Sequence, residues 1–364
     1  MALFSSPAYL RSPTWMQEWM LSARGWARSS LREGAAFRTA LADVERTQWL
    51  DEAALAAHQL ARLKASLVHA AEHVPFYQQR FRSAGFDPRD VAHLSDLSKV
   101  PELTKRDVFD AGAAMLSTSH RGPRFSASSS GTTGMSLTGW RDMNSINREN
   151  AFVWRQMHWA GMKLGDRRVW MRGDKMVPAT QKQPPYWRHN SGEHMLMMSS
   201  YHLSEANARH YVDAMEAYDP IIIQAYPSAV LLLARHLDNQ GQRFKGRSLR
   251  GVVTSSETVT DEHRQLVQRV FGCPLFDWYG SMERMAAIGT CEHGRYHLIA
   301  DYSHTELMPE ADGTCEVIGT TFDNRLMPWV RYRLGDKIVP ASPGTRCACG
   351  RAFPLIDHIV GRVN

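Results

Sequence analysis

The sequence predicts an α/β fold, because from about residue 165 onward short apolar strands alternate with amphipathic helices. Alternation of this kind is typical of a sheet built mainly from parallel strands. A chain of 364 residues, 43% of them hydrophobic, is long enough for one large domain or two ordinary ones with a substantial core. The strand-like runs are 167–173, 221–226, 249–257 and 273–280, and the helical runs between them are 204–218 and 227–240.

The N-terminal region is predicted to be helical, beginning with residues 14–33. Trp15, Trp19 and Trp26 share one face of this helix, and Arg24, Arg28 and Arg32 share another. A Trp/Arg helix suits an anionic membrane surface, whereas tryptophans at this spacing equally suit packing on the rest of the protein or on a partner subunit. Packing is the preferred interpretation.

Further elements follow in order. Residues 46–82 predict a long helix broken near Pro75, and a helix capped by Thr104 follows a loop. Residues 189–204 have no clear period and predict a mobile surface segment. Residues 295–340 resemble hairpins, with a turn at Asp312-Gly313.

Composition excludes several classes of protein. No apolar stretch is long enough to span a membrane, and the N-terminus lacks a signal-peptide pattern, so the cytoplasm is the expected compartment. The net charge of +6 comes without a basic run, which argues against a nucleic-acid partner. Five cysteines without a secretory signal favour metal binding or inert burial over disulfides.

The stretch SASSSGTTGMSLTG, from Ser126 to Gly139, is the first chemical motif. Small hydroxyl residues and glycines let successive backbone N–H groups turn inward and bind a phosphate, and the hydroxyls add donors. It is not a Walker A loop, because no Gly-Lys-Ser/Thr follows. A flexible Ser/Gly linker is the alternative.

Three later motifs carry polar groups at strand ends. DWYGSMER, 277–284, follows an apolar strand, where Ser281 is suited to a phosphate and Glu283 to Mg²⁺. In RYRLGDKIV, 331–339, the carboxylate of Asp336 is able to accept both hydroxyls of a ribose, although an ordinary Gly-Asp hairpin turn is the alternative. Arg362 follows a glycine in the C-terminal GRVN.

These four motifs, in this order and spacing, resemble the adenylate-forming superfamily of acyl-CoA synthetases, peptide-synthetase adenylation domains and luciferases. SSSGTTG is similar to its phosphate loop, WYGSMER to its aromatic-Gly-Ser/Thr-x-Glu motif, and YRLGD to its Tyr-x-x-Gly-Asp motif. LARLKASLVHAAEHVPFYQQRF and CEHGRYHLIADYSHTEL resemble the phenylacetate-CoA ligase branch, especially CapK-like members linked to capsule and exopolysaccharide synthesis. The resemblance covers nearly the whole chain from about residue 46. It implies the large N-terminal domain of an adenylate-forming enzyme, with layered helices, mixed β-sheets and a small β-rich subdomain.

The family implies a two-step reaction. A carboxylate attacks the α-phosphate of ATP to give an acyl-adenylate and pyrophosphate, and a thiol, usually of coenzyme A, then takes the acyl group. By position, the β- and γ-phosphates are held by Ser129, Ser130, Gly131, Thr132, Thr133 and Gly134. The remaining carried-over roles are Ser281 on the α-phosphate, Glu283 on Mg²⁺, Tyr279 and Gly280 at the adenine, Ser256 and Glu257 in the wall of the adenine and acyl pockets, and Asp336 with Arg362 on the ribose.

Two departures from the family pattern stand out. Ser136, Leu137 and Thr138 replace the Pro-Lys-Gly that often follows the loop, so a lysine for pyrophosphate is missing, and Arg141 or Lys105 is the candidate substitute. The chain also stops at Asn364, where the family continues through a hinge into a small C-terminal domain. A truncation at the hinge is preferred to a natural form with impaired chemistry.

The cysteines suggest a structural zinc site. Three thiolates and one imidazole, from Cys291, His297, Cys347 and Cys349, make a tetrahedral set, and the phenylacetate-ligase branch implies such a site. His293 is the rival for His297 and Cys315 the rival thiol, Cys273 is expected to be inert core, and a CxC pair without metal is the alternative.

The expected domains are an N-terminal helical region at 1–120, an α/β nucleotide- and acyl-binding core at 121–290, a β-rich zinc subdomain at 291–360, and the start of a hinge at 361–364. The expected function is ATP-dependent activation of a small carboxylic acid and transfer to coenzyme A. Two alternatives remain open: transfer to an amine or hydroxyl in polysaccharide biosynthesis, and a non-catalytic, zinc-stabilised nucleotide-binding module. The branch also implies a homodimer as a possible assembly.

Overall fold

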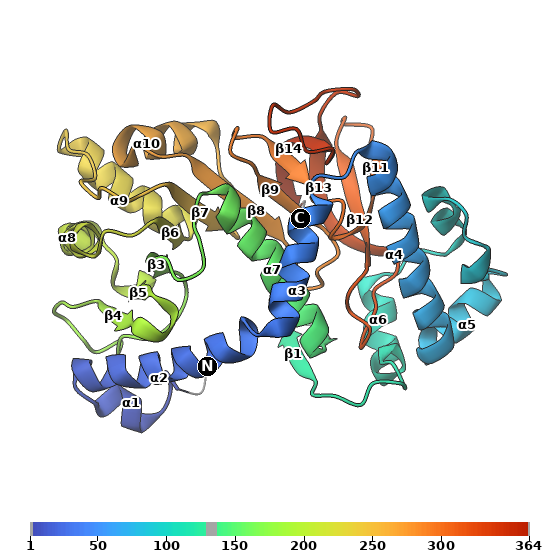
Figure 1. Ribbon diagram of the computed structural model, residues 1–364, viewed down its shortest axis with the longest axis horizontal. Coiled ribbons are helices and arrows are strands. Elements are labelled where there is room, and N and C mark those ends of the chain that lie inside the picture. The colour runs from blue at the N-terminus through green and yellow to red at the C-terminus, as the bar shows by residue number, and fades with distance from the viewer. Residues whose placement is uncertain (1–2, 129–136, 363–364) are drawn as a thin grey trace. The chain divides into compact units, whose positions relative to one another are not determined.

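The computed structural model describes residues 3–128 and 137–362 (Figure 1). The chain divides into two units built from discontinuous segments. The first consists mainly of residues 1–34 and 156–278, and the second mainly of residues 35–155, 279–289 and 295–364. Their limits differ from the contiguous boundaries expected at residues 120, 290 and 360.

The first unit contains the parallel sheet that the sequence predicts. Its strands follow the order β4-β5-β3-β6-β7-β8. All neighbours in this row are parallel except β4 and β5, so an antiparallel edge strand closes an otherwise parallel sheet. The strands are β3 (Arg168–Met171), β4 (Trp187–Asn190), β5 (Met195–Met198), β6 (Ile222–Ala225), β7 (Gly251–Ser255) and β8 (Leu275–Gly280).

Three helices make the crossovers between these strands: α8 (Ala208–Tyr218), α9 (Pro227–Asn239) and α10 (Asp261–Phe271). The middle helix, α9, packs against both of the others (Figure 1). Its apolar positions are buried because they face a core made of strand residues such as Val169, Ile223 and Val252. This is the βαβ arrangement expected from strands and helices that alternate along the chain.

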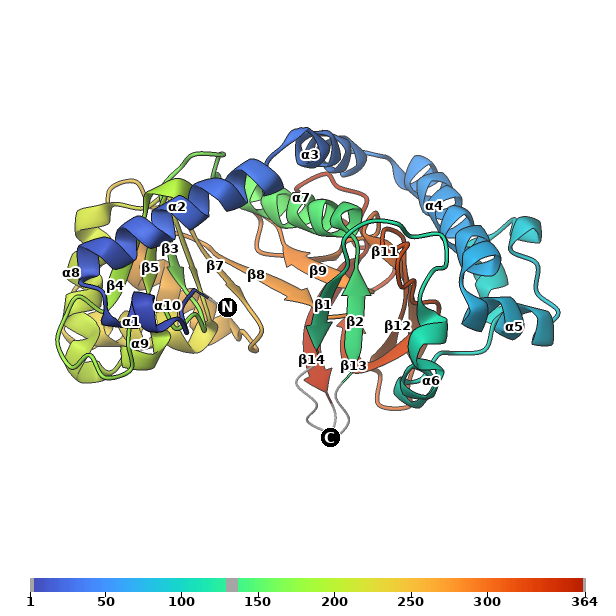
Figure 2. The same ribbon diagram turned by 90° about the horizontal axis from the view of Figure 1, so that it is seen from below.

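The N-terminal helices also belong to the first unit. They are α1 (Pro7–Arg11) and α2 (Thr14–Arg32), and α2 packs along β4 and the 3₁₀ turn Ser191–Glu193 (Figure 2). The approach is close: a Cβ on Gly192 would lie 2.3 Å from the Ser22 carbonyl oxygen of α2. Only glycine therefore fits at this contact.

The second unit carries a mostly antiparallel set of strands in the order β9-β10-β14-β13-β12-β11. A separate hairpin pairs β1 with β2. The strands are β1 (Phe125–Ser128), β2 (Thr138–Arg141), β9 (Ala287–Thr290), β10 (Tyr296–Leu298), β11 (Ser303–Pro309), β12 (Cys315–Thr321), β13 (Tyr332–Pro340) and β14 (Leu355–Arg362).

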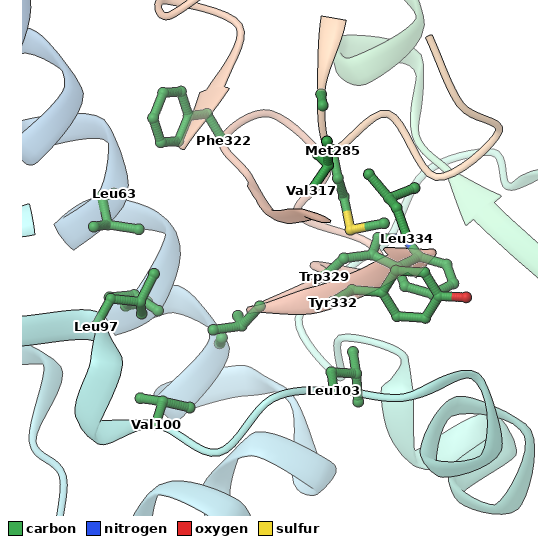
Figure 3. Packing of buried hydrophobic residues seen from close by; sticks show 14 of the residues in the cluster. Leu63, Leu97, Val100, Leu103, Met285, Val317, Phe322, Trp329, Tyr332 and Leu334 are labelled. Atoms are coloured by element: carbon green, nitrogen blue, oxygen red, sulfur yellow. The ribbon is translucent and has the colours of Figure 1, made fainter. Parts of the chain in front are cut away.

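Helices between residues 52 and 111 pack on these strands and form one hydrophobic core with them. In Figure 3, Leu63 of α4 and Leu97 lie on one side of this core, and Met285, Trp329 and Tyr332 lie on the other. The helices of this unit are α3 (Ala35–Thr47), α4 (Glu52–His73), α5 (Pro75–Ser83), α6 (Lys105–Ala111) and α7 (Met143–Trp159). Short 3₁₀ turns lie at 88–90, 94–99 and 112–115 in this unit. In the first unit they lie at 191–193, 200–202 and 205–207.

Several local predictions are confirmed. Thr104 caps α6 in a reciprocal arrangement with Asp107, and α5 begins at Pro75, directly after α4. The predicted α2 is present over almost its whole range.

Two interpretations were wrong. Residues 189–204 do not form a mobile surface segment, since they contain β5, all four residues of which are buried. A strand covered on both faces has no alternation of polar and apolar residues, which is why its period was not visible. The tryptophans of α2 do not pack on the rest of the chain either: Trp15 and Trp19 remain 66% and 64% exposed.

Candidate active site

The predicted phosphate loop, Ser129–Gly134, lies outside the described residues. The structure describes the chain up to Ser128 and again from Leu137. Ser128 pairs with Thr138 across the antiparallel strands β1 and β2. Arg141, one of the two candidates to replace the missing lysine, ends β2, and Lys105, the other, begins α6.

Asp336 is the centre of a polar cluster in the second unit. It lies on β13, is 7% exposed, and stands opposite Arg362 in the register of β13 and β14. Its Oδ2 accepts a hydrogen bond from the Tyr279 hydroxyl at 2.6 Å, and its Oδ1 accepts from the Arg362 Nε at 3.2 Å. The structure therefore brings together three predicted nucleotide-binding residues that are up to 83 positions apart, counted from Tyr279 to Arg362.

Tyr279 is held in its protonated form. Burial, and then the negative charge of Asp336, raise the pKa of its hydroxyl well above the ordinary value. The hydroxyl is therefore a hydrogen-bond donor at physiological pH. A carboxylate has about four acceptor positions, so Asp336 keeps capacity for ligand hydroxyls after binding Tyr279 and Arg362.

The turn after β8 carries Ser281 and Glu283. The Ser281 Oγ is buried and has no hydrogen-bond partner among the described residues. Glu283 is only 6% exposed, and its negative charge acts to raise the pKa values of Arg141, Tyr279 and Tyr332. A buried hydroxyl without a hydrogen-bond partner is costly and rare, so Ser281 stays a candidate for a ligand contact at this turn.

Two arginines hold this turn in place. Arg141 donates to the Met282 carbonyl oxygen, and Arg284 donates to the Ser145 carbonyl oxygen at 2.9 Å while lying 3.5 Å from Glu149. The backbone of Arg284 has φ = 60°, a left-handed conformation that is strained for a side chain of this size. Such strain clusters at functional sites, and Arg284 was missed from the sequence because its role depends on α7, which lies far away in the chain.

Ser256 and Glu257 lie at the carboxyl ends of the parallel strands in the first unit. Ser256 has φ = 76° and accepts a hydrogen bond from the Arg172 guanidinium at 3.1 Å. Both carboxylate oxygens of Glu257 bind Ser228 at the start of α9, at 2.7 and 2.9 Å. Glu257 thus holds the turn after β7 against the start of α9, and Ser256 contacts the guanidinium of Arg172.

That cation, Arg172, was missed by the sequence interpretation. It follows β3 directly, and its guanidinium lies 5.2 Å from the ring of Tyr226, with a pKa that burial lowers. The signal was a charged residue at the carboxyl end of a parallel strand, where ligands bind in open α/β sheets.

The four predicted zinc ligands come together. One donor atom from each of Cys291, His297, Cys347 and Cys349 lies within 4.8 Å of the others. The Nδ1 of His297 lies 3.3 Å from the Phe353 carbonyl oxygen, and its Nε2 lies 3.4 Å from the Cys349 Sγ. A proton on Nδ1 directs the lone pair of Nε2 toward the thiols, which is the arrangement of a metal-binding histidine.

The rival residues lie elsewhere. His293 is exposed and is not in the group. Cys315 packs in the hydrophobic core of the second unit, and burial raises the pKa of Cys273 to about 12, so its thiol is inert.

No helix among the described residues is long and apolar enough to cross a membrane. No known family profile matches the chain.

Individual relatives do match. The phenylacetate-coenzyme A ligase of Pseudomonas putida is 30% identical over 336 residues, which make up 89% of this chain and 73% of that protein. The corresponding enzyme of Escherichia coli is 30% identical over 325 residues, covering 85% and 71%. Protein CapK of Staphylococcus aureus is 23% identical over 265 residues, covering 72% of this chain but only 58% of that protein.

Solved structures show the same fold. An open form of 2-hydroxyisobutyryl-CoA ligase, in complex with 2-HIB-AMP and CoA, matches with a TM-score of 0.67 at 18% identity, covering 87% of this chain and 77% of that one. The same ligase in its postadenylation state gives a TM-score of 0.68 at 17% identity, covering 88% and 70%.

Fold and sequence together define an adenylate-forming protein of the acid–thiol ligase class. Within that class the chain belongs to the phenylacetate-CoA ligase family, in the branch that also contains CapK-like proteins. It spans between 58% and 73% of the length of the three relatives described above.

Proposed function

We propose that this chain binds ATP and a small carboxylic acid and forms an acyl-adenylate, which a thiol such as that of coenzyme A then accepts. The single observation that carries this proposal is the cluster in which Tyr279 and Arg362 hold the carboxylate of Asp336. A carboxylate fixed on both oxygens is preorganised to accept the two vicinal hydroxyls of a ribose, and Tyr279 adds an aromatic ring beside it.

In the first step, a carboxylate oxygen of the acid bonds to the α-phosphorus, and the bond from that phosphorus to the bridging oxygen of pyrophosphate breaks. The leaving pyrophosphate takes the electron pair. In the second step, a thiolate sulfur bonds to the acyl carbon and AMP leaves. In-line displacement of this kind depends on positioning and on neutralising charge. The Ser281 hydroxyl donates to the α-phosphate, and the guanidinium of Arg141 supplies positive charge beside the same turn.

Mg²⁺ fits the carboxylate of Glu283, because oxygen ligands are the ones this cation prefers and Glu283 is buried beside the unpartnered Ser281 hydroxyl. The ion would supply charge neutralisation at the phosphates.

Nucleotide binding is the first test, because it depends on the described residues of the second unit. Asp336→Ala should weaken AMP binding about ten-fold or more in calorimetric titration, as expected for lost hydrogen bonds to a charged group. Asp312→Ala removes an exposed carboxylate of the same unit from the β11–β12 turn and is the matched control. Equal AMP affinity in both variants, or no AMP binding by the unaltered chain, contradicts the proposal.

Release of pyrophosphate from Mg-ATP, measured across a panel of carboxylic acids, is the second test. Release that depends on one acid identifies the substrate, and Glu283→Gln should remove most of it. Stimulation by coenzyme A supports a thioester product over transfer to an amine or hydroxyl. AMP binding without acid-dependent release would instead support a nucleotide-binding module.

Zinc in the Cys₃His group is part of the proposal. Thiolates at about 2.3 Å from a tetrahedral zinc ion lie about 3.8 Å apart, which fits donor atoms that all lie within 4.8 Å of one another. Four protein ligands leave no open position, so the ion would be structural. Changing both Cys347 and Cys349 to Ser should abolish zinc measured by elemental analysis and lower the melting temperature, whereas His293→Ala should change neither. Unchanged zinc in the double variant contradicts the site.

A further inference from the structure

One face of the parallel sheet carries polar side chains where β3, β6 and β7 end. The register sets Trp170 of β3 beside Gln224 of β6 on this face. Side chains alternate between the two faces of a strand, so the residues two positions further along lie on the same face. They are Arg172 after β3, Tyr226 after β6 and, in the matching register, Ser255 at the end of β7. In open α/β sheets the carboxyl ends of strands are where ligands bind.

The guanidinium of Arg172 is fixed by its neighbours on this face. It lies 5.5 Å from the ring centre of Trp170 and 5.2 Å from that of Tyr226. Its Nη2 donates to the Ser255 hydroxyl and, at 3.1 Å, to the Ser256 hydroxyl. The two serines therefore bind a single nitrogen of a group that has five N–H donors. These contacts hold the cation in one place without supplying it with a negative charge.

Arg172 has no carboxylate partner in the described parts of the chain, since none of their carboxylate oxygens lies within 4.0 Å of its guanidinium. The negative charge of Asp174 acts on Arg172, but this carboxylate accepts the Trp170 Nε1–H at 2.6 Å. Glu257, at the turn after β7, uses both oxygens to bind Ser228. Burial lowers the pKa of Arg172, because the charged form is deprived of water. An anionic ligand at this place would offset that cost.

A second polar group on the same face lacks a partner. Gln224 is 7% exposed, and its Oε1 has no hydrogen-bond partner among the residues that the structure describes. Its neighbour in the register is Trp170, two positions before Arg172. A purely hydrocarbon occupant of this face would leave the Gln224 oxygen buried and unsatisfied, which is costly. The face therefore suits a ligand that carries polar groups.

We propose that Arg172 determines specificity by binding a second anionic group of the acid substrate, so that the acid is a dicarboxylate or a similar dianion. This inference rests on the acid activation proposed above and names the class of acid. A guanidinium matches a carboxylate with two parallel N–H···O bonds. The carboxylate that attacks ATP is the less suitable partner, because it loses its charge as the adenylate forms. A cation bound to it would stabilise the substrate more than the transition state, whereas a second anionic group keeps its charge throughout.

Calorimetric titration with matched pairs of acids tests this inference without requiring turnover. The pairs are butyrate with succinate, hexanoate with adipate, and phenylacetate with 4-carboxyphenylacetate. In at least one pair the diacid should bind about ten-fold or more tightly than the monoacid, as expected for hydrogen bonds between charged groups. Arg172→Gln should remove that preference and leave the affinity for the monoacid nearly unchanged. Arg172→Lys should keep part of the preference, because it retains the charge but loses the forked geometry.

The matched control is Arg235→Gln, which removes an exposed arginine from α9 of the same unit. It should leave the preference unchanged, and the unfolding transitions should show that every variant is folded. The inference is overturned if no diacid binds more tightly than its monoacid, or if Arg172→Gln keeps the full preference. It is also overturned if Arg172→Gln weakens the binding of AMP or coenzyme A and leaves the preference for the diacid unchanged.

Pyrophosphate release from Mg-ATP, measured with the same acids, separates this inference from the proposed activity. A preference for a diacid that Arg172→Gln abolishes, without any release of pyrophosphate, supports the anion site and contradicts the activation of the acid. Release that depends on monoacids alone, and that Arg172→Gln does not change, supports the activation and overturns the anion site.

Discussion

The buried ion pair between Arg155 and Asp301 offers the sharpest test of how the second unit is held together. Both side chains are 1% exposed. The Arg155 guanidinium donates to the two carboxylate oxygens at 2.6 and 3.0 Å, and the Thr47 hydroxyl donates to the same carboxylate at 2.5 Å. The pair thus links α3, α7 and the segment after β10.

Asp301→Ala removes the counterion of a buried guanidinium. Taking one partner out of such a pair costs about 3–5 kcal/mol, because the remaining charge stays in a medium of low polarity. Each kcal/mol lowers the melting temperature of a domain of this size by about 2–4 °C, so we expect a fall of about 6–20 °C. Replacing both partners, as Arg155→Met with Asp301→Leu, should recover most of the loss, since apolar groups of similar volume tolerate burial.

The control uses the same chemistry at the surface of the same unit. Asp357 accepts from Arg295 at 3.0 Å, and both side chains are 42% exposed. Solvent screens this pair, so Asp357→Ala should cost about 0–1 kcal/mol. The free energies of unfolding are to be compared in urea titrations followed by circular dichroism. A loss below about 1 kcal/mol for Asp301→Ala, matching that of Asp357→Ala, would refute the assigned role of burial.

Two further predictions concern packing and pH. Gly192→Ala would place a Cβ 2.3 Å from the Ser22 carbonyl oxygen, so it should lower the free energy of unfolding by about 1–3 kcal/mol. Gly34→Ala is the control, because the atom nearest to its Cβ lies 3.4 Å away, and it should change the free energy little in the same urea titration. His304 is buried, and burial followed by the charge of Arg331 lowers its pKa from 6.5 to about 4. As the pH falls below about 6.5, the unfolded chain binds a proton at His304, whereas the native chain binds it only near pH 4. The free energy of unfolding should therefore fall between about pH 6.5 and 4, by on the order of 3 kcal/mol in total. His304→Gln should flatten that part of the stability profile, and an unchanged slope would contradict this assignment.

Much of the architecture was visible in the sequence because it depends on local periodicity. The helix broken at Pro75, the cap at Thr104 and the apolar strands of the parallel sheet follow from patterns within a few residues of one another. The family follows from motifs in order along the chain, and Asp336, Tyr279 and Arg362 could be named because each lies within one of those motifs.

Other features were invisible for a physical reason. A strand buried on both faces, such as Met195–Met198, has no alternating pattern to detect. Arg172 and Arg284 act through contacts with residues that are distant in sequence, and no local pattern predicts these contacts. The sequence favoured His297 as the zinc ligand but left His293 as its rival, because spacing alone does not say which imidazole is buried beside the thiols.

By itself, then, the sequence determined the class of fold, the family and the chemical types at the candidate site, since these reside in residue identity and short-range order. Only the tertiary structure decided which side chains meet, which are exposed and which way α2 is turned. Periodicity had shown that its tryptophans share a face, but the direction of that face depends on Gly192, Gln17 and Leu21, whose partners come from distant parts of the chain.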